Sequence, residues 1–274
     1  MSSRTCPAAL ALQRSIVATR SPTRGHFVDM LEDGQKVKET TELKVWEIAC
    51  EEELLRLQGA NGFDQFAPPW CGRAVWEEFI SPAEVITLRA YAEGSFEGLH
   101  HRGAEVSLVL PFHKTCTGRV DSFAKAENDS LDLAFSVVQR IQRALADAFT
   151  TPALHLCGAL LRRVQLPAIL GPQQLMPSHD SFAAHADRAT VAAYHYSAVL
   201  YLSGRGDDFQ NGELVFMDGD TDRHLAPKRG RLVAFTSGLE NLHRVVPPDG
   251  GPRYILALWF GSGNETCIPE LTLT

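Results

Sequence analysis

The second half of the chain is a series of short apolar stretches that are separated by turn-forming residues. Glycine, proline, aspartate and asparagine occur between the stretches, and no helix-length amphipathic segment lies among them. Strands at this density without connecting helices favour an antiparallel sandwich or barrel over a parallel sheet. The predicted strands span residues 153–165, 194–202, 212–217, 230–237, 242–247 and 253–260.

Three segments that precede these strands have the periodicity or the capping signals of helices. Ser81, Pro82 and Glu84 form a helix start, because serine caps a helix, proline suits its first position and glutamate can bond back to the cap. Residues 131–149 place apolar side chains at helical spacing, and residues 41–57 do so in part. The predicted fold class is therefore α+β and β-rich, with N-terminal helices that support a double-sheeted core.

Charge and hydropathy exclude several classes of partner. The chain has 26 basic and 33 acidic residues, and this net charge of −7 argues against nucleic acid or anionic lipid as the main partner. The longest apolar runs, 196–202 and 254–260, have the length of strands and fall far short of the roughly 20 residues of a membrane-spanning helix. The six cysteines include no C-x-x-C pair, which removes the usual structural zinc spacing and the thioredoxin-type motif.

The first residues differ in composition from the rest of the chain. Residues 1–28 contain four arginines, several serines and threonines, and no acid. This composition is typical of an organelle transit peptide and equally of a flexible, weakly basic tail, and it lacks the apolar core of a secretory signal. We expect a flexible or targeting tail over 1–28, an N-terminal extension over 29–70 and one folded domain over 71–265. Compartment and oligomeric state stay open at this stage.

A histidine and an aspartate two positions apart form the first candidate site. On an extended backbone, residues i and i+2 project to the same side, so His185 and Asp187 can bind one metal ion, although a surface pair is the commoner explanation of this spacing. The best third ligand is His243, where a turn leads into a predicted strand. Two imidazoles and one carboxylate form the facial triad of non-haem iron sites. His179 and His195 are weaker candidates because neither has an aspartate two positions on.

A basic residue follows the third candidate ligand. Arg253 lies ten residues after His243, across the turn-forming run 247–252. If that run closes a hairpin, antiparallel counting puts the two residues opposite each other. An arginine in an apolar strand is costly unless it meets an anion, and its planar fork suits a carboxylate. An internal salt bridge is the alternative role of Arg253.

Several further motifs accompany these residues, in the order His185-x-Asp187, 196–202, Asp208-Phe209-x-x-Gly212-Glu213-Leu214-x-Phe216, 227–238, Glu240-Asn241-x-His243-x-Val245 and Gly251-x-Arg253-Tyr254. With them, the segment 185–260 resembles the iron and 2-oxoglutarate dependent dioxygenases, in their prolyl hydroxylase branch. Within that branch it is similar to leprecan-type prolyl 3-hydroxylases and to the 2-oxoglutarate and iron-dependent oxygenase domain-containing proteins.

The resemblance implies a fold, a set of ligands and a reaction. The fold would be a double-stranded β-helix, or jelly roll, whose metal and cosubstrate core spans 153–261. His185, Asp187 and His243 would bind Fe(II), and Arg253 would bind the distal carboxylate of 2-oxoglutarate. The cosubstrates would be 2-oxoglutarate and O2, with ascorbate as the reductant. The expected reaction is hydroxylation of a C–H bond, of a prolyl residue in a protein or peptide, with succinate and CO2 as coproducts.

Two alternatives accompany this expectation. The same chemistry could act on a lysyl residue or a small molecule, or the domain could be a non-catalytic β-sandwich that binds a peptide or glycan. Relatives place a further polar residue, upstream of the H-x-D motif, against the cosubstrate, and the segment 162–177 offers no clear match to it. A dry pocket is expected from the strand residues Val199, Leu214, Val233 and Leu256.

Overall fold

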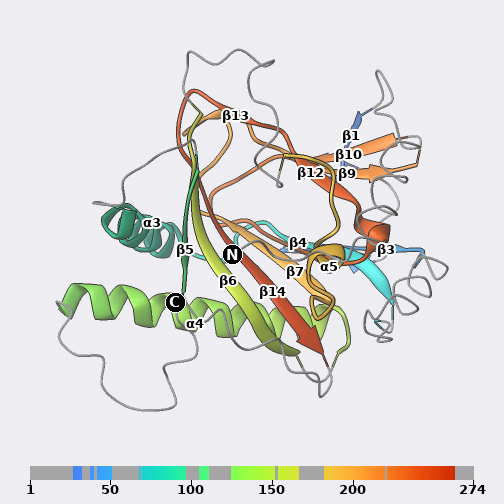
Figure 1. Ribbon diagram of the computed structural model, residues 1–274, viewed down its shortest axis with the longest axis horizontal. Helices are drawn as coiled ribbons and strands as arrows, with labels where there is room; N and C mark the ends of the chain where they lie inside the picture. The colour runs from blue at the N-terminus through green and yellow to red at the C-terminus, as the bar shows by residue number, and fades with distance from the viewer. Residues whose placement is uncertain are drawn as a thin grey trace.

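A large sheet and a small sheet make up most of the fold (Figure 1). The structure, a computed structural model, describes residues 27–32, 38–39, 42–50, 68, 70–96, 105–110, 125–151, 154–166, 182–219 and 221–262. Helices α3 (Pro82–Phe96) and α4 (Lys125–Ala148) lie on one side of the large sheet and the small sheet lies on the other. The architecture is therefore β-rich, with helices along one face.

The large sheet contains eight strands, and every neighbouring pair is antiparallel. Across the sheet the order is β2 (Lys38–Glu39), β3 (Leu43–Ile48), β4 (Cys71–Trp76), β11 (Leu232–Thr236), β7 (Tyr196–Tyr201), β14 (Arg253–Ser262), β6 (Leu154–Val164) and β5 (Glu105–Val109). The small sheet has the order β1 (Phe27–Asp29), β10 (Thr221–Leu225), β9 (Leu214–Asp218) and β12 (His243–Val245), and only its β1–β10 pair is parallel. A separate pair joins β8 (Gln210–Asn211) to β13 (Pro248–Asp249).

All six predicted strands are present as β6, β7, β9, β11, β12 and β14. The helix predicted over 41–57 is wrong over 43–48, where the structure has strand β3, and residues 51–57 lie outside the described residues. The reason is that β3 is covered on both faces. Val45 packs toward the helices and the adjacent Trp46 packs between the sheets, so apolar residues occur on both faces and the simple alternation of a half-buried strand is lost.

Helix α3 (Pro82–Phe96) begins at the predicted capping sequence. The Ser81 backbone N–H donates to Glu84 Oε2 at 2.8 Å, and the Glu84 N–H donates to Ser81 Oγ at 3.3 Å. Helix α4 (Lys125–Ala148) covers the other predicted segment and starts six residues before 131. Of the helices that the structure describes, none combines the length and the hydropathy that crossing a bilayer requires.

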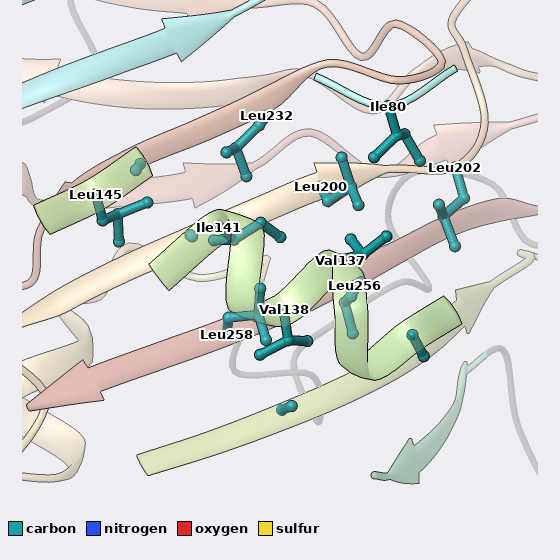
Figure 2. Packing of buried hydrophobic residues seen from close by; sticks show 14 of the residues in the cluster. Ile80, Val137, Val138, Ile141, Leu145, Leu200, Leu202, Leu232, Leu256 and Leu258 are labelled. Carbon is teal, nitrogen blue, oxygen red and sulfur yellow. The ribbon is translucent and has the colours of Figure 1, made fainter. Parts of the chain in front are cut away.

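Side chains from these helices and from one face of the large sheet form the outer cluster (Figure 2). It includes Ile80, Val137, Val138, Ile141, Leu145, Leu200, Leu202, Leu232, Leu256 and Leu258. The inner cluster lies between the two sheets and comprises Met30, Trp46, Val75, Tyr201, Leu214, Phe216, Leu225, Val233, Phe235, Ile255 and Ala257. Strands with two buried faces explain why these segments read as continuous apolar runs.

The alternation along β14 separates the two clusters. Leu256 and Leu258 point to the outer cluster, whereas Ile255 and Ala257 belong to the inner one. The prediction that Leu256 lines the pocket is therefore wrong, because it counted burial without the parity of the strand. Of the other predicted pocket residues, Leu214 and Val233 are in the inner cluster, and Val199 packs against it.

A disulfide joins Cys50, just after β3, to Cys71, the first residue of β4, with a Cα–Cα distance of 5.2 Å. Replacing both cysteines with alanine is expected to lower the free energy of unfolding by about 3 kcal/mol, because the crosslink restricts the unfolded chain. Urea denaturation of the variant and the wild-type protein without reductant measures the difference. Equal unfolding midpoints would contradict a stabilising role for this bond.

Asp208 ties the loop after β7 to helix α3. Its carboxylate accepts hydrogen bonds from Arg89 Nη1 at 2.6 Å, from Arg229 Nε and Nη2 at 2.8 Å each, and from the Gly204 N–H at 2.8 Å. Burial alone would raise the pKa of Asp208, but the hydrogen bonds from Arg229, Gly204 and Arg89 outweigh it and lower the pKa from 3.8 to about 2. The folded state therefore favours the charged carboxylate.

This shift predicts a pH dependence of stability. Because the folded pKa is lower than the unfolded one, Asp208 stabilises the fold above about pH 4, and the contribution is lost as the pH falls toward 2. We expect Asp208→Asn to lower the thermal midpoint at pH 7 and to approach the wild-type midpoint near pH 2. Thermal unfolding across this pH range measures the effect. The control variant is Asp207→Asn, which changes the exposed neighbouring aspartate. A gap that stays constant with pH would contradict the assignment.

Candidate metal centre

Three side chains converge where β12 of the small sheet meets the segment before β7. One ligand atom each from His185, Asp187 and His243 lies within 4.8 Å of the others. His185 Nε2 is 3.7 Å from Asp187 Oδ1, and His243 Nε2 is 4.0 Å from Asp187 Oδ2. The two predicted stretches of chain therefore meet, with two imidazoles and one carboxylate close enough for one ion. This set is the only group of three or more histidine, cysteine or acidic side chains with such spacing in the described ranges.

A backbone bridge brings these distant stretches together. The His185 N–H donates to the His243 carbonyl at 2.8 Å, and the His243 N–H donates to the His185 carbonyl at 2.9 Å. Asp187 does not continue a strand, because it opens the short helix α5 (Asp187–Thr190). The spacing argument still holds, since Ala186 between them is extended (φ −119°, ψ 132°) and leaves both side chains on one side.

Hydrogen bonds orient each of the three groups. His185 Nδ1 lies 2.9 Å from the Ala183 carbonyl and His243 Nδ1 lies 2.9 Å from the Asn241 carbonyl. A carbonyl only accepts, so each Nδ1 carries the proton and each Nε2 presents a lone pair. The Ser197 hydroxyl donates to Asp187 Oδ2 at 2.6 Å, which holds the carboxylate from behind.

The electrostatic surroundings favour the neutral form of His243. Its side chain is only 6% exposed, and burial is the largest cause that lowers its pKa from 6.5 to about 4. The nearby His185 lowers the pKa further, and Asp187 opposes the shift. A neutral imidazole is the form that binds a metal ion, so His243 is ready for ligation at neutral pH.

Arg253 is buried on β14, but its predicted pairing is wrong. It lies opposite Val164 of β6 in the large sheet, whereas His243 lies opposite Phe216 of β9 in the small sheet. The turn-forming run between them does not close a hairpin, because Pro248 and Asp249 form β13 and pair with β8. The chain thus crosses from one sheet to the other between the two residues.

Tyr201 is a candidate site residue that the sequence reasoning missed. It is fully buried in the inner cluster, and the Arg253 guanidinium carbon lies 5.5 Å from its ring centroid. Its hydroxyl has no hydrogen-bond partner among the described residues. Burial raises the pKa of Tyr201 and Arg253 opposes the rise. Strand parity was the available signal, since Tyr201 lies two residues after Val199, which was expected in the pocket.

An aromatic pair lies near the carboxylate of the cluster. Tyr194 and Trp259 stack with ring centroids 5.3 Å apart and an interplanar angle of 15°, and both are partly buried. Burial raises the pKa of Tyr194, and the charge of Asp187 raises it further. Tyr194 therefore lies within electrostatic range of Asp187, and its stacking partner Trp259 belongs to β14.

The weaker histidine candidates do not join the cluster. His195 is buried, and its Nδ1 lies 3.0 Å from Ser262 Oγ, which gives it a structural role at the end of β14. His179 lies outside the described residues, as does most of the segment in which a further cosubstrate contact was sought.

Several known proteins are similar to this chain. Residues 172–261, which include all four predicted site residues, match the model of the 2OG-Fe(II) oxygenase superfamily. The 2-oxoglutarate and iron-dependent oxygenase domain-containing protein 3 of Rattus norvegicus is 29% identical over 250 residues, which cover 86% of this chain and 76% of that protein. Human prolyl 3-hydroxylase 3 is 30% identical over 212 residues, or 68% of this chain and 28% of that protein. A solved prolyl 4-hydroxylase from Phytophthora capsici has 19% identity and a TM-score of 0.49, covering 88% of this chain and 73% of that one.

Proposed function

We propose that this chain, which carries a 2OG-Fe(II) oxygenase domain and is a 2-oxoglutarate-dependent dioxygenase, hydroxylates a prolyl residue in a protein or peptide. Proteins of this family use Fe(II), 2-oxoglutarate and O2, and ascorbate is their typical reductant. The observation that carries the proposal is the backbone bridge between His185 and His243, which joins the two halves of the triad. Such a convergence favours an enzyme over a non-catalytic sandwich.

The triad suits Fe(II) in its donor chemistry. His185 Nε2, His243 Nε2 and one oxygen of Asp187 would hold the ion and leave one side open, as in facial-triad sites. The bound ion supplies the activation of O2 for oxidation of a C–H bond. Ser197 keeps the second oxygen of Asp187 occupied, so the carboxylate has one oxygen free for the metal.

Arg253 and Tyr201 suit the distal carboxylate of 2-oxoglutarate. A buried guanidinium can pair with both oxygens of a carboxylate, and the neighbouring phenol can donate one further hydrogen bond. Both groups lie in the low-dielectric space between the sheets, where a charged anchor binds strongly and excludes water. Tyr201 would thus be a cosubstrate contact on β7, after the His185-x-Asp187 motif, that the sequence reasoning did not identify.

The stacked pair Tyr194 and Trp259 supports a prolyl acceptor. A pyrrolidine ring is apolar and compact, and it can pack against an aromatic face. The relative named prolyl 3-hydroxylase 3 supports the same acceptor class.

The arrangement of the two sheets around the inner cluster supports a double-stranded β-helix core over 153–261. The division into a tail (1–28), an extension (29–70) and a domain (71–265) stays a prediction. The pairing of β3 with β4 favours extending the domain to include residues 43–48. The disulfide between Cys50 and Cys71 favours an oxidising compartment, where such bonds persist.

A peptide assay tests the proposed function. The full chain is incubated with Fe(II), 2-oxoglutarate, ascorbate and a proline-rich peptide library, and mass spectrometry locates any gain of one oxygen. We expect the oxygen on proline, with equimolar succinate, and none with Asp187→Ala. Oxygen found on lysine or on a small molecule would show that the acceptor is not proline. An absence of 2-oxoglutarate turnover with every acceptor would contradict the proposal.

A further inference from the structure

Arg73 is a charged side chain in the interior that the proposed reaction does not use. It lies on β4 of the large sheet and its side chain is 2% exposed. Burial lowers the pKa of Arg73 from its ordinary value, and the hydrogen bonds that Arg73 donates to Asp218 oppose the shift. A buried guanidinium is costly unless its donors are satisfied, so its partners reveal what it holds in place.

Arg73 connects the large sheet to two elements on the opposite side. Its Nη1 and Nη2 donate to the Asp218 oxygens at 2.6 and 2.5 Å, at the end of β9 in the small sheet. Its Nε donates to Asn241 Oδ1 at 2.7 Å, in the short 3-10 helix η2 (Leu239–Asn241). The guanidinium carbon also lies 3.8 Å from the ring centroid of Phe216. These contacts use the whole planar fork of the side chain.

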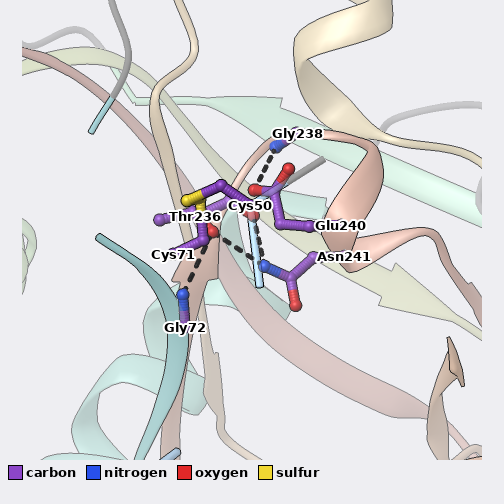
Figure 3. Close-up of a disulfide and its surroundings, with 7 residues drawn as sticks. All are labelled: Cys50, Cys71, Gly72, Thr236, Gly238, Glu240 and Asn241. Atoms are coloured by element: carbon purple, nitrogen blue, oxygen red, sulfur yellow. Dashed lines mark hydrogen bonds between the residues drawn. A yellow bond between two sulfur atoms is a disulfide. The ribbon is translucent and has the colours of Figure 1, made fainter. Parts of the chain in front are cut away.

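Asn241 connects this arginine to a candidate metal ligand. Its side-chain NH2 donates to the Thr236 carbonyl at 2.9 Å and to the Thr236 hydroxyl at 2.8 Å (Figure 3). Its backbone carbonyl lies 2.9 Å from His243 Nδ1. Gly72, next to Arg73 and Cys71, donates its N–H to the same hydroxyl at 3.4 Å. The carbonyl that orients the imidazole therefore belongs to Asn241, whose side-chain oxygen accepts from Arg73 and whose side-chain nitrogen donates to Thr236.

Phe216 is the second connection. It is the β9 residue directly opposite His243, and its ring centroid lies 6.2 Å from that of the imidazole. Arg73 thus contacts two neighbours of His243. One is Asn241, whose carbonyl accepts the hydrogen bond from His243 Nδ1, and the other is Phe216, which lies opposite His243 in the small sheet.

We infer that Arg73 is a positioning residue of the metal centre, acting on His243 through Asn241 and Phe216. The inference rests on the proposed function, because it assigns His243 as a ligand. A residue that only stabilised the packing of β4 would affect the free energy of unfolding and leave the metal affinity of the folded protein unchanged. Loss of a hydrogen bond that orients a ligand typically costs about 10-fold to 100-fold in metal affinity.

Two variants test the inference on the full chain, with Mn(II) as the probe and electron paramagnetic resonance as the readout. Arg73→Lys keeps the positive charge but loses the planar fork that bonds to Asn241 and to both oxygens of Asp218 at once. Asn241→Ser removes the side-chain amide that bonds to Arg73 and Thr236, and it keeps the backbone carbonyl that faces His243. We expect each variant to raise the Mn(II) Kd about 10-fold to 100-fold. The Kd of the double variant should be close to that of either single variant, since both changes break the same connection.

A matched control is available in Arg89→Lys. Arg89 also pairs with an aspartate, at 2.6 Å, and its guanidinium lies 5.0 Å from the centroid of the Tyr254 ring, but that ring belongs to the outer cluster. This variant should bind Mn(II) with wild-type affinity. Should Arg73→Lys fail to fold, Asn241→Ser carries the test alone.

The outcomes separate this inference from the proposed function. Wild-type Mn(II) affinity in a folded Arg73→Lys or Asn241→Ser protein overturns the role of Arg73, provided that His185→Ala loses the metal. Mn(II) binding that survives in His185→Ala overturns the proposed metal centre itself.

Discussion

Replacing His243 with alanine is expected to abolish 2-oxoglutarate turnover. The variant removes one of three side chains that would hold the iron, and the two that remain leave the ion weakly bound and misoriented. The backbone hydrogen bonds that join residue 243 to His185 do not involve the side chain, so the fold should survive. Succinate release measures turnover, and binding of Mn(II) measures the metal separately.

The control for this variant is His224→Ala, which removes an imidazole from β10 of the same sheet but outside the triad. We expect it to keep both metal binding and succinate release. Circular dichroism of both variants checks that the sheets are intact. Unchanged succinate release in His243→Ala would remove this residue from the reaction.

Replacing Arg253 with alanine is expected to raise the apparent KM for 2-oxoglutarate by roughly 100-fold to 4,000-fold. Removing one partner of a desolvated charge pair costs about 3–5 kcal/mol, and each 1.4 kcal/mol corresponds to a factor of ten in affinity. Arg253→Lys should be affected less, since it keeps the charge and loses the second hydrogen bond. Initial rates of succinate formation against 2-oxoglutarate concentration measure the effect.

A second variant separates the anchor from general damage to the large sheet. Tyr201→Phe removes only the buried hydroxyl near Arg253, and the loss of one hydrogen bond predicts an increase in KM of about 10-fold. Arg89→Gln serves as the control, because it breaks an arginine–aspartate pair beside the helices and should leave KM unchanged. Similar KM values in Arg253→Ala and wild type would return Arg253 to the alternative of an internal salt bridge.

Features that depend on contacts between residues close together in the chain could be predicted from the sequence. The Ser81–Glu84 cap and the six strands follow from turn chemistry and apolar runs, and each was found at its predicted place. His185 and Asp187 also lie together as expected, because a single extended residue between them decides the geometry. In all three cases the deciding contacts span a few residues.

Errors arose where a pattern had more than one three-dimensional solution. The turn-forming run before Arg253 was expected to close a hairpin, and it instead carries the chain from the small sheet to the large one. Residues 43–48 were expected in a helix, since a strand buried on both faces has no polar alternation to reveal it. Leu256 was expected in the pocket because burial does not state which face is buried.

The sequence by itself determined the positions of the strands, the start of α3 and the identity of the candidate ligands, because backbone propensity and ligand chemistry belong to individual residues and their near neighbours. Only the tertiary structure decided which sheet each strand joins, which face each side chain uses and how residues remote from the triad reach it. The bridge between His185 and His243, the disulfide between Cys50 and Cys71 and the network around Arg73 are of this second kind. Each depends on a contact between segments far apart in the chain, and such contacts form only when both sheets and their helices bury their apolar faces together.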